Sequence, residues 1–271
     1  MIAFANAKIN LGLYVTERRT DGYHNLESIF LPVSLCDVLE AIRSEGDEIA
    51  FTTQGRRIDG DAESNLCVKA YRLLQRDFKL GGVEATMLKQ VPIGAGLGGG
   101  SSDGAHMLKL LNELFSLNLS TDQLQHYAAQ LGSDCPFFIS NKPAFVHGRG
   151  ELLDPIDMPA IQSHVVIIHP GIHVGTADAY RGIKPSAASF DLRTIGQLPM
   201  DQWQGRITND FERVVFALHP EIASIKRTLL DQGALYSSMS GSGSAVFGFF
   251  DERIALSGIP QNYFVHWGKL L

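Results

Sequence analysis

The residues best suited to chemistry in this 271-residue chain begin with a glycine-rich run between Val91 and Asp103. Five of the seven residues from Gly94 to Gly100 are glycine, and two serines and an aspartate follow them. Glycine loses more backbone freedom on folding than any other residue, so a run this dense indicates a backbone wrapped closely around a bound group. A flexible linker is the alternative, but regular patterns flank the run on both sides and disfavour it.

The residues after this run have the spacing of a helix. Apolar residues recur on one helical face at Ala105, Leu108, Leu111 and Leu114. We expect Ser101 or Ser102 to cap this helix, with Asp103 in its first turn. A glycine loop that leads into a helix presents unpaired N–H groups and the positive end of the helix dipole. Together these features bind an anion such as phosphate.

Two better-known phosphate loops do not fit this run. A P-loop requires lysine at the position where Gly100 stands. The glycines also match G-x-G-x-x-G, but Pro92 immediately precedes them. No strand with an acidic residue follows about twenty residues later, as a dinucleotide site requires, because Asp122 opens a helix. The sequence therefore predicts a different phosphate cradle.

Polar side chains in two other places are candidates for catalysis. Lys8 and Asn10 have the period-two spacing that puts both on one face of an otherwise apolar strand. A lysine on a strand is usually solvated, but a polar pair favours a site. Asp134 stands between a helix stop at Gly132 and a turn at Cys135. It is either an Asx turn or cap, or a carboxylate held rigidly beside the glycine loop.

Aromatic residues and a second small-residue turn are candidates for binding. Tyr23 and His24 follow an Asp-Gly turn; the tyrosine could fill the core instead, while the histidine could bond a ligand. Tyr180 is suited to helix packing or to stacking on a flat ring. Residues 240–244 are all Gly or Ser, more than a hairpin requires. We therefore expect this turn to approach a ligand or the first loop closely.

Composition narrows the class of protein. The net charge of -6 argues against nucleic-acid binding. Three isolated cysteines favour a reducing compartment over a disulfide framework. Residues 1–8 resemble the start of a strand rather than a signal peptide, and the longest apolar runs are too short to cross a bilayer. We expect a soluble cytoplasmic protein with no membrane or nucleic-acid partner.

The pattern of the whole chain predicts a mixed fold. Strands are expected at 2–15, 26–33, 37–43, 48–53, 83–91, 144–147, 164–169, 234–239, 245–250 and 262–267. Helices are expected from Asn65, after the glycine loop, from the Ser120-x-x-Gln123 capping box, and at 176–181, 209–218 and 221–232. We expect 182–202, rich in Pro and Ser, to be a surface excursion. Pro155 and Pro159 are taken to mark a domain boundary.

Together these stretches resemble the GHMP small-molecule kinase family. That family carries an N-terminal strand with a polar pair, a Pro-x-Gly-x-Gly-Leu-Gly-Ser/Gly-Ser-Ser loop and a late Gly-Ser-Gly turn, and all three occur here in order. Residues 7–13, 19–24, 132–138, 169–171 and 240–245 are similar to the isoprenoid-pathway branch. The resemblance implies an α+β fold of two domains. These are a ribosomal-protein-like N-terminal domain with the ATP loop (1–157) and a ferredoxin-like C-terminal domain (158–271).

The resemblance also implies roles for individual residues. Asp134 matches the catalytic base and Lys8 its cationic partner. The ATP loop comprises Pro92, Ile93, Gly94, Ala95, Gly96, Leu97, Gly98, Gly99, Gly100, Ser101 and Ser102. The phosphate-proximal turn comprises Ser240, Gly241, Ser242 and Gly243. The substrate-binding positions are Asn10, Tyr23, His24, Thr176 and Tyr180.

The implied reaction is phosphorylation of an alcohol by ATP, in which positioning and charge stabilisation do most of the work. The acceptor would be a small molecule that carries cytidine diphosphate. Mg²⁺ would bridge phosphate oxygens without a dedicated protein metal site. We expect a monomer or weak homodimer. Two departures from the family pattern are visible: Gly104 stands where Ala is usual, and Tyr236-Ser237-Ser238 precedes Met239 where a small residue and Arg are commoner.

Three other functions remain open on the sequence alone. The chain could be a homoserine- or mevalonate-type kinase of the same family. It could be a nucleotide-binding module without catalysis, which the presence of both Lys8 and Asp134 disfavours. A glycine-rich dehydrogenase would instead bind nicotinamide nucleotide tightly and would not bind ATP.

Overall fold

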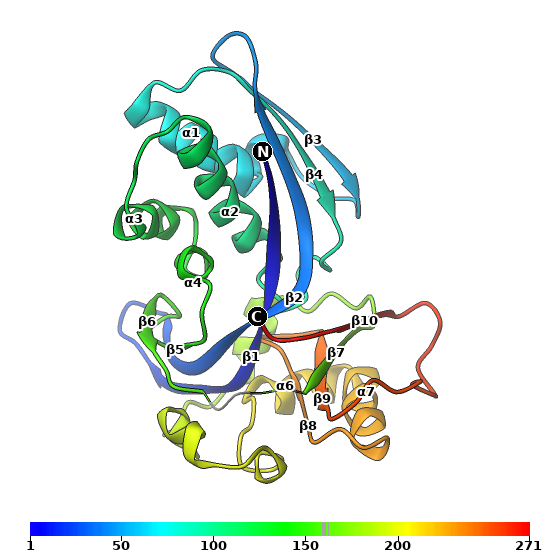
Figure 1. Ribbon diagram of the computed structural model, residues 1–271. Coiled ribbons are helices and arrows are strands. Elements are labelled where there is room, and N and C mark those ends of the chain that lie inside the picture. The colour runs from blue at the N-terminus through cyan, green and yellow to red at the C-terminus, as the bar shows by residue number, and fades with distance from the viewer. Residues whose placement is uncertain (159–160, 162) are drawn as a thin grey trace. The chain divides into compact units, whose positions relative to one another are not determined.

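The structure is a computed structural model that describes residues 1–158, 161 and 163–271. The chain forms two compact units. The first unit comprises Met1–Ala7, Leu35–Ile93 and Gly98–Lys142, and the second comprises Lys8–Ser34, Gly94–Leu97 and Pro143–Leu271. The long strands β1 (Ile2–Arg18) and β2 (His24–Arg43) pair with each other and contribute residues to both units (Figure 1).

The first unit is built from helices on one side of a sheet. Strand β4 lies between β3, which runs parallel to it, and the second half of β2, which runs antiparallel. Figure 1 shows the helices together beside these strands. The elements are β3 (Ile49–Gly55), a 3-10 turn (Ala62–Ser64), α1 (Leu66–Phe78), β4 (Val83–Lys89), α2 (Gly99–Leu114), α3 (Thr121–Leu131) and α4 (Cys135–Ser140).

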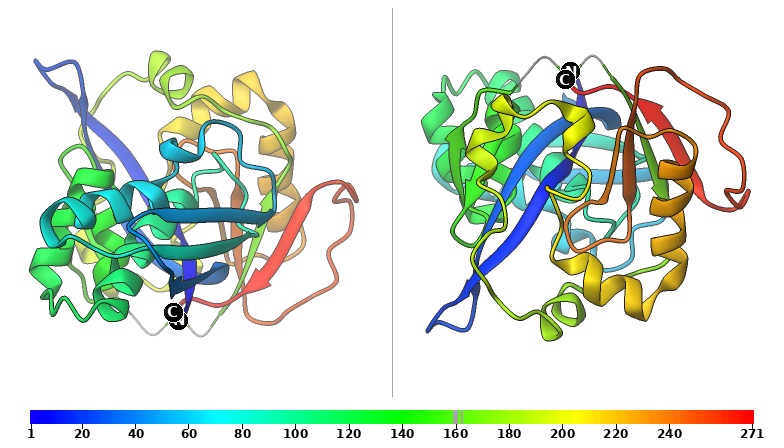
Figure 2. Two further views of the ribbon diagram at one scale, coloured as in Figure 1. Left: turned by 90° about the horizontal axis from the view of Figure 1, so that it is seen from above. Right: turned by 90° about the horizontal axis from the view of Figure 1, so that it is seen from below.

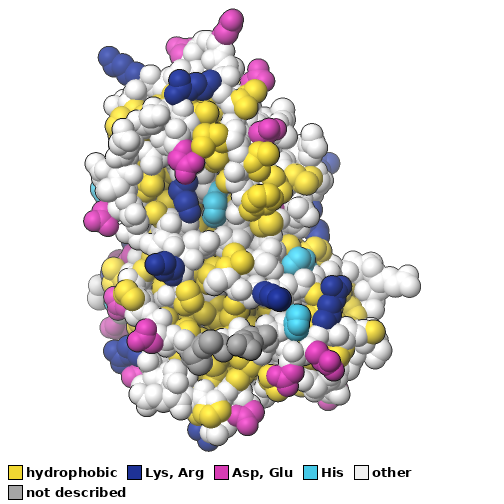
Figure 3. Space-filling model, viewed as in Figure 1, with side chains coloured by type: hydrophobic (Ala, Val, Ile, Leu, Met, Phe, Trp, Pro, Cys, Tyr) yellow, Lys and Arg dark blue, Asp and Glu magenta, His cyan; other side chains and the backbone are white. Residues whose placement is uncertain are grey.

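Strand alternation decides which side chains of this sheet are buried. In β4 the odd-numbered residues Val83 to Lys89 are buried, while Glu84 and Leu88 face the other side. The face of the sheet that carries Leu88 has exposed apolar residues. Hydrophobic side chains are visible on the surface of the protein in Figure 3. A strand with two such faces is what a half-covered sheet requires. The exposed large hydrophobic residues of this unit's strands are Ile2, Phe4, Ile42 and Leu88.

The second unit contains an antiparallel sheet in the order β10-β7-β9-β8. Helices α6 and α7 lie beside it (Figure 2). Phe211 and Ile225 enter a core shared with Val166 and Val246. The first half of β2 pairs with β5, which pairs with β6. The elements are β5 (Ala144–His147), β6 (Leu152–Pro155), β7 (His164–His169), α5 (Thr176–Arg181), 3-10 turns at Leu192–Gln197 and Met200–Gln202, α6 (Phe211–Leu218), α7 (Pro220–Asp231), β8 (Tyr236–Met239), β9 (Val246–Phe250) and β10 (Phe264–Gly268).

Local signals placed several elements correctly. The helix predicted from Asn65 is α1, and the Asn65 side chain caps it by accepting from the Cys67 N–H. Ser120 and Gln123 form the predicted capping box at the start of α3. The prediction of two separate strands at 26–33 and 37–43 was wrong, because β2 is continuous. Both halves of β2 have a partner strand, so the backbone stays extended between them.

The predicted cap of the loop helix was also wrong. Helix α2 begins at Gly99, and its N-cap is Gly98 in the left-handed conformation at φ +68°. Ser101 and Ser102 therefore lie inside the helix. A Cβ on Gly104 would stand 2.9 Å from the Leu66 Cβ, so the glycine at this position allows α1 and α2 to approach closely.

Elements that depend on tertiary contacts were missed. Helix α4 had been expected as a turn, and strand β6 was not predicted. Residues 182–202 are not simply a surface excursion, because Leu192 and Ile195 are fully buried. Pro155 ends β6, whereas Pro159 lies outside the described residues, and the domain boundary at 157/158 stays a prediction. Among the described residues, no helix has the length and apolar character to cross a bilayer.

Candidate active site

The small-residue turn at Ser240–Ser244 lies against the glycine-rich loop within the second unit. The Ser240 hydroxyl donates to the Gly96 carbonyl at 2.8 Å, and the Ala245 N–H donates to the Ala95 carbonyl at 3.1 Å. A Cβ on Gly96 would stand 1.9 Å from the Ser240 carbonyl oxygen. This confirms the prediction that the turn approaches the first loop closely, and it explains why Gly96 has no side chain.

Strand β1 supplies the third part of this arrangement. The Lys8 N–H donates to the Leu97 carbonyl at 2.9 Å. The Asn10 N–H donates to the Ser240 hydroxyl at 3.2 Å. The N-terminal strand, the glycine loop and the late turn are therefore hydrogen-bonded to one another, although more than two hundred residues separate Asn10 from Ser240 in the chain.

Lys8 is buried beneath this junction. Its side chain leaves only 4% of the residue exposed, so the alternative of a solvated lysine was wrong. The ammonium donates to the Asn10 Oδ1 at 2.5 Å and lies 4.2 Å from the centre of the Phe30 ring. The Asn10 Nδ2 donates to the Ser28 hydroxyl at 2.9 Å, which fixes the orientation of the amide. The polar pair is thus pre-organised, with a cation held at a buried position.

Aromatic side chains of the second unit gather at α5. The rings of His24 and Tyr180 are stacked, with centres 4.9 Å apart and an interplanar angle of 23°. The edge of Phe211 meets Tyr180 at 4.8 Å. Tyr23 is 58% exposed and lies beside the Arg149 guanidinium, so it does not fill the core. The Thr176 hydroxyl, at the start of α5, lies 3.5 Å from the Ser242 hydroxyl of the turn.

The helical end of the glycine loop belongs to the first unit. The N–H groups of Gly99, Gly100 and Ser101 precede the first hydrogen bond of α2, which the Ser102 N–H donates to Gly98. A Cβ on Gly100 would meet no atom within 4 Å, so space is open in front of this helix end.

The alternation of left-handed residues along the loop is a second feature of the cradle. Gly94, Gly96 and Gly98 have φ values of +63°, +78° and +68°, while the residues between them do not have positive φ. Backbones that alternate in this way form concave anion-binding nests. The density of glycine in the sequence is therefore explained by conformation as well as by close packing.

Asp134 lies beside this helix end, in the first unit. It is the N-cap residue of α4, it is half-buried, and its side chain makes no capping hydrogen bond. The pKa of the adjacent Cys135 thiol is raised to about 12, first by burial and then by the charge of Asp134, while the Ser101 side chain of α2 lowers it. This carboxylate is therefore close to the N-terminus of α2. The Asp134 side chain therefore does not cap α4 through a hydrogen bond, and its role as the base stays a prediction.

A buried ionic cluster lies under the start of the loop. The Lys89 ammonium, at the end of β4, donates to Asp37 at 2.6 Å and to Asp103 at 2.5 Å, and all three residues are at most 3% exposed. Asp37 also accepts from the N–H groups of Gln90 at 2.5 Å and Val91 at 2.9 Å. The cluster therefore joins β2, the residues just before the loop, and the beginning of α2.

The two carboxylates of this cluster differ in their partners. Asp103 accepts only from Lys89 among the described residues, and its Oδ1 has no hydrogen-bond partner there. Burial, opposed by Lys89 and reinforced by Asp37, raises the pKa of Asp103 to about 7. Burial alone would lower the pKa of Lys89, but the neighbouring carboxylates raise it. Asp103 therefore takes up a proton near neutral pH.

Sequence reasoning missed this cluster although a signal existed. Lys89 continues the buried phase of β4, and Asp37 stands in the same phase as the buried Leu35 and Leu39 of β2. A charged residue in phase with a buried face must find a partner. Ser238 is fully buried and donates to Glu212 at 3.0 Å.

Comparison with known proteins shows the family of this chain. A family model described as "GHMP kinases N terminal domain" matches residues 65–149, and "GHMP kinases C terminal" matches residues 183–260. The chain belongs to the GHMP kinase family. This GHMP kinase is accordingly a small-molecule kinase that uses ATP, and its two-domain α+β fold is confirmed.

Relatives of this GHMP kinase match it over its whole length. The chain is 50% identical over 274 residues to a protein of Bacteroides thetaiotaomicron named 4-diphosphocytidyl-2-C-methyl-D-erythritol kinase, with 100% of each chain covered. It is 48% identical over 258 residues to a protein of the same name from Bacteroides fragilis, with 94% of each covered. Isoprenoid-pathway kinases are thus among the relatives, as the sequence motifs predicted.

Solved structures agree with this likeness. A crystal structure of 4-(cytidine 5'-diphospho)-2C-methyl-D-erythritol kinase has a TM-score of 0.80 and 34% identity, covering 92% of this chain and 90% of its own. The mevalonate kinase of Methanococcus jannaschii has a TM-score of 0.72 at 12% identity, with 100% and 98% covered. The second likeness shows the fold alone.

Proposed function

We propose that this GHMP kinase transfers the γ-phosphoryl group of ATP to the 2-hydroxyl of 4-diphosphocytidyl-2-C-methyl-D-erythritol. The reaction would belong to the non-mevalonate route to isoprenoid precursors. The observation that carries the proposal is the full-length likeness to relatives with this named activity.

The aromatic residues near α5 support a substrate with a flat base. Tyr180 is flanked by His24 in a stacked arrangement and by the edge of the buried Phe211, so its ring is packed between two other rings. This aromatic cluster suits a cytosine ring, while the His24 nitrogens can donate to or accept from its polar edge. Homoserine and mevalonate carry no ring that would use these residues.

Lys8 would stabilise the charge of the transferred phosphoryl group, and Asp134 would accept the proton of the acceptor hydroxyl. Asp134 would accept the proton of the acceptor hydroxyl as its oxygen attacks phosphorus. The Lys8 ammonium would neutralise negative charge that develops during transfer, and its burial strengthens this effect because few water molecules screen it. Asn10, which accepts from Lys8, would hold the ammonium in place.

The glycine loop would hold ATP through its backbone. The left-handed glycines of the nest and the open space at Gly100 fit a phosphate group, and a side chain at either place would narrow the cradle. Mg²⁺ would be held mainly by phosphate oxygens and water, and it would neutralise phosphate charge. The turn at Ser240–Gly243, hydrogen-bonded to the loop, would lie near the same phosphates.

A panel of acceptor alcohols tests the substrate. ATP is offered with 4-diphosphocytidyl-2-C-methyl-D-erythritol, with homoserine and with mevalonate, and ADP release is measured together with the phosphorus NMR spectrum of the product. We expect efficient turnover with the cytidylyl alcohol alone. A higher kcat/KM for homoserine or mevalonate would transfer the assignment to another branch of the family, and no turnover with any alcohol would favour a binding module.

The variant Asp134→Ala tests the base. Loss of a general base lowers kcat by about 10²- to 10⁴-fold, while the KM for ATP stays near its wild-type value. Asp122→Asn is the matched control, because Asp122 is an exposed acid in the first turn of the neighbouring helix α3. Turnover of Asp134→Ala within a few-fold of wild type would remove Asp134 from this role.

The compartment and assembly are part of the same proposal. We place the enzyme in the cytoplasm, because Cys36, Cys67 and Cys135 are all free thiols in the structure, as a reducing compartment would keep them. A monomer or weak homodimer is expected, and sedimentation at micromolar concentration measures it.

A further inference from the structure

The segment that precedes α6 is anchored on strand β1 of the second unit. The Leu13 N–H donates to the Thr208 carbonyl, and the Asp210 N–H donates to the Leu13 carbonyl, both at 2.9 Å. The Asp210 carboxylate accepts from the Val15 N–H at 2.8 Å. Asn209 stands in the middle of this anchored segment and is only 3% exposed. Its side chain therefore projects from a backbone that is hydrogen-bonded on both sides.

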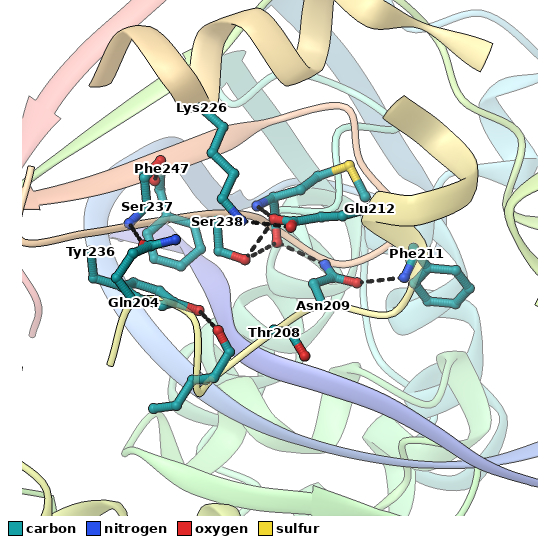
Figure 4. Close-up of polar contacts among 12 residues, drawn as sticks. Gln204, Thr208, Asn209, Phe211, Glu212, Lys226, Tyr236, Ser237, Ser238 and Phe247 are labelled. Carbon is teal, nitrogen blue, oxygen red and sulfur yellow. Dashed lines mark hydrogen bonds and ion pairs between the residues drawn. The ribbon is translucent and has the colours of Figure 1, made fainter. Parts of the chain in front are cut away.

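The Asn209 side-chain amide is fully used, and it bonds the turn. Its Nδ2 donates to the Met239 carbonyl and to the Gly241 carbonyl, each at 2.8 Å, and its Oδ1 accepts from the Phe211 N–H at 3.0 Å. The two carbonyls flank Ser240, the residue that contacts the glycine loop. Only a side chain with two donors and one acceptor in a plane satisfies all three groups. Figure 4 shows this amide between Phe211 and the end of β8.

A carboxylate holds the same stretch of chain from α6. Glu212 Oε1 accepts from the Met239 N–H at 2.9 Å and from the Ser238 hydroxyl at 3.0 Å, while its Oε2 pairs with Lys226 at 2.6 Å. In Figure 4 the Lys226 side chain reaches from α7 to this carboxylate. The ion pair compensates the burial of the acid, so the backbone of Met239 is held at both its N–H and its carbonyl.

We propose that Asn209, supported by Glu212, is the positioning residue that fixes the Ser240–Gly243 turn against the glycine loop and so sets the affinity for ATP. The proposal rests on the proposed kinase function. The physical route is short: Asn209 sets the carbonyls on either side of Ser240, and Ser240 in turn bonds Gly96 and Asn10. A turn free to move by an ångström would widen the phosphate cradle without touching the reacting groups.

The test compares Asn209→Asp with wild type. Aspartate has the same shape, but it removes both donors and places an acceptor against two carbonyl oxygens. We expect the KM for ATP to rise about tenfold or more, and the dissociation constant for ATP measured calorimetrically without acceptor to rise equally. The kcat at saturating ATP should stay within about threefold of wild type, because binding and not chemistry is affected.

Gln204→Ala is the matched control, because the exposed Gln204 side chain accepts from the Ser237 N–H on the same strand, away from the turn. Its KM for ATP should match wild type. If Asn209→Asp does not fold, Glu212→Gln replaces it, since glutamine keeps an acceptor for the Met239 N–H but loses the ion pair with Lys226, and a smaller rise in the KM for ATP is expected.

Each result decides the proposal. An ATP affinity of Asn209→Asp, or of Glu212→Gln in its place, within twofold of wild type would overturn it, even if the urea midpoint falls, because that pattern shows a merely structural role. Failure of the proposed function is read separately on wild-type protein: no binding of ATP overturns both, whereas transfer to a different alcohol leaves the positioning role intact and testable with that alcohol.

Discussion

Replacing Gly96 by alanine tests whether the loop and the turn are in the contact described here. Gly96 has φ +78°, and a Cβ at this position would stand 1.9 Å from the Ser240 carbonyl oxygen. Real Cβ atoms essentially never approach an atom within 3.0 Å, so the Ser240 backbone would have to retreat by about 1 Å. The retreat would stretch the hydrogen bonds from Ser240 to Gly96 and from Ala245 to Ala95.

The cost can be divided into two parts. A left-handed backbone costs an L-residue with a Cβ about 1–2 kcal/mol. Two lost hydrogen bonds add about 1 kcal/mol each, which brings the destabilisation of Gly96→Ala to about 3–4 kcal/mol. Gly258→Ala is the control for the first part, because Gly258 has φ +70° and a Cβ there would meet no atom within 4 Å. Gly258→Ala should therefore lose only about 1–2 kcal/mol, the amount that the left-handed backbone costs.

Urea unfolding followed by tryptophan fluorescence measures both variants. Both tryptophans, Trp203 and Trp267, belong to the second unit, which contains the contact. We expect Gly96→Ala to lose about 2 kcal/mol more than Gly258→Ala, and its KM for ATP to rise while that of Gly258→Ala does not. Equal losses in the two variants, with an unchanged KM for ATP, would refute the contact between Gly96 and Ser240.

Two further predictions concern buried charges. Lys8→Met should lower kcat by about 10²- to 10³-fold, because the charge that develops in the transition state is no longer stabilised. The urea midpoint of unfolding should stay unchanged, because methionine packs over Phe30 in the same volume. A kcat within threefold of wild type would contradict the role of Lys8. The folded state binds a proton at Asp103 up to a pKa of about 7, whereas the unfolded chain releases it near pH 4, so stability should fall as pH rises from 4 to 7 and then level off. The loss of unfolding free energy due to Asp103, on the order of a few kcal/mol, should be absent in Asp103→Asn when unfolding midpoints are measured from pH 4 to pH 7. An identical pH profile in both proteins would show that Asp103 does not titrate in this range.

Local patterns were sufficient for the features that depend on near neighbours in the chain. The start of α1 at Asn65 and the Ser120–Gln123 capping box were predicted correctly, because each depends on residues within a few positions of one another. The glycines between Gly94 and Gly100 were attributed to a backbone wrapped around a bound group, and the structure accounts for them by left-handed positions and by the close approach of Ser240. The GHMP family followed from motif order, and the comparisons confirmed it.

The errors came from contacts between distant segments. Serine was the expected cap of α2, but the left-handed Gly98 closes the loop one turn earlier. The continuous strand β2 needed β4 and β5 as partners, neither of which is adjacent to it in sequence. Local propensity cannot report such pairing, because the stabilising hydrogen bonds belong to the partner strands.

The sequence by itself determined which residues could do chemistry: Lys8 and Asn10 on one strand face, a glycine nest, an acid at 134 and a late turn of small residues. Only the tertiary structure decided how they are held. The Lys89 side chain bonds carboxylates, and the Asn209 amide bonds backbone carbonyls, that are distant in the chain, at 2.5 to 2.8 Å. A hydrogen bond forms only when donor and acceptor are in direct contact, so these bonds exist only after folding has brought both partners together.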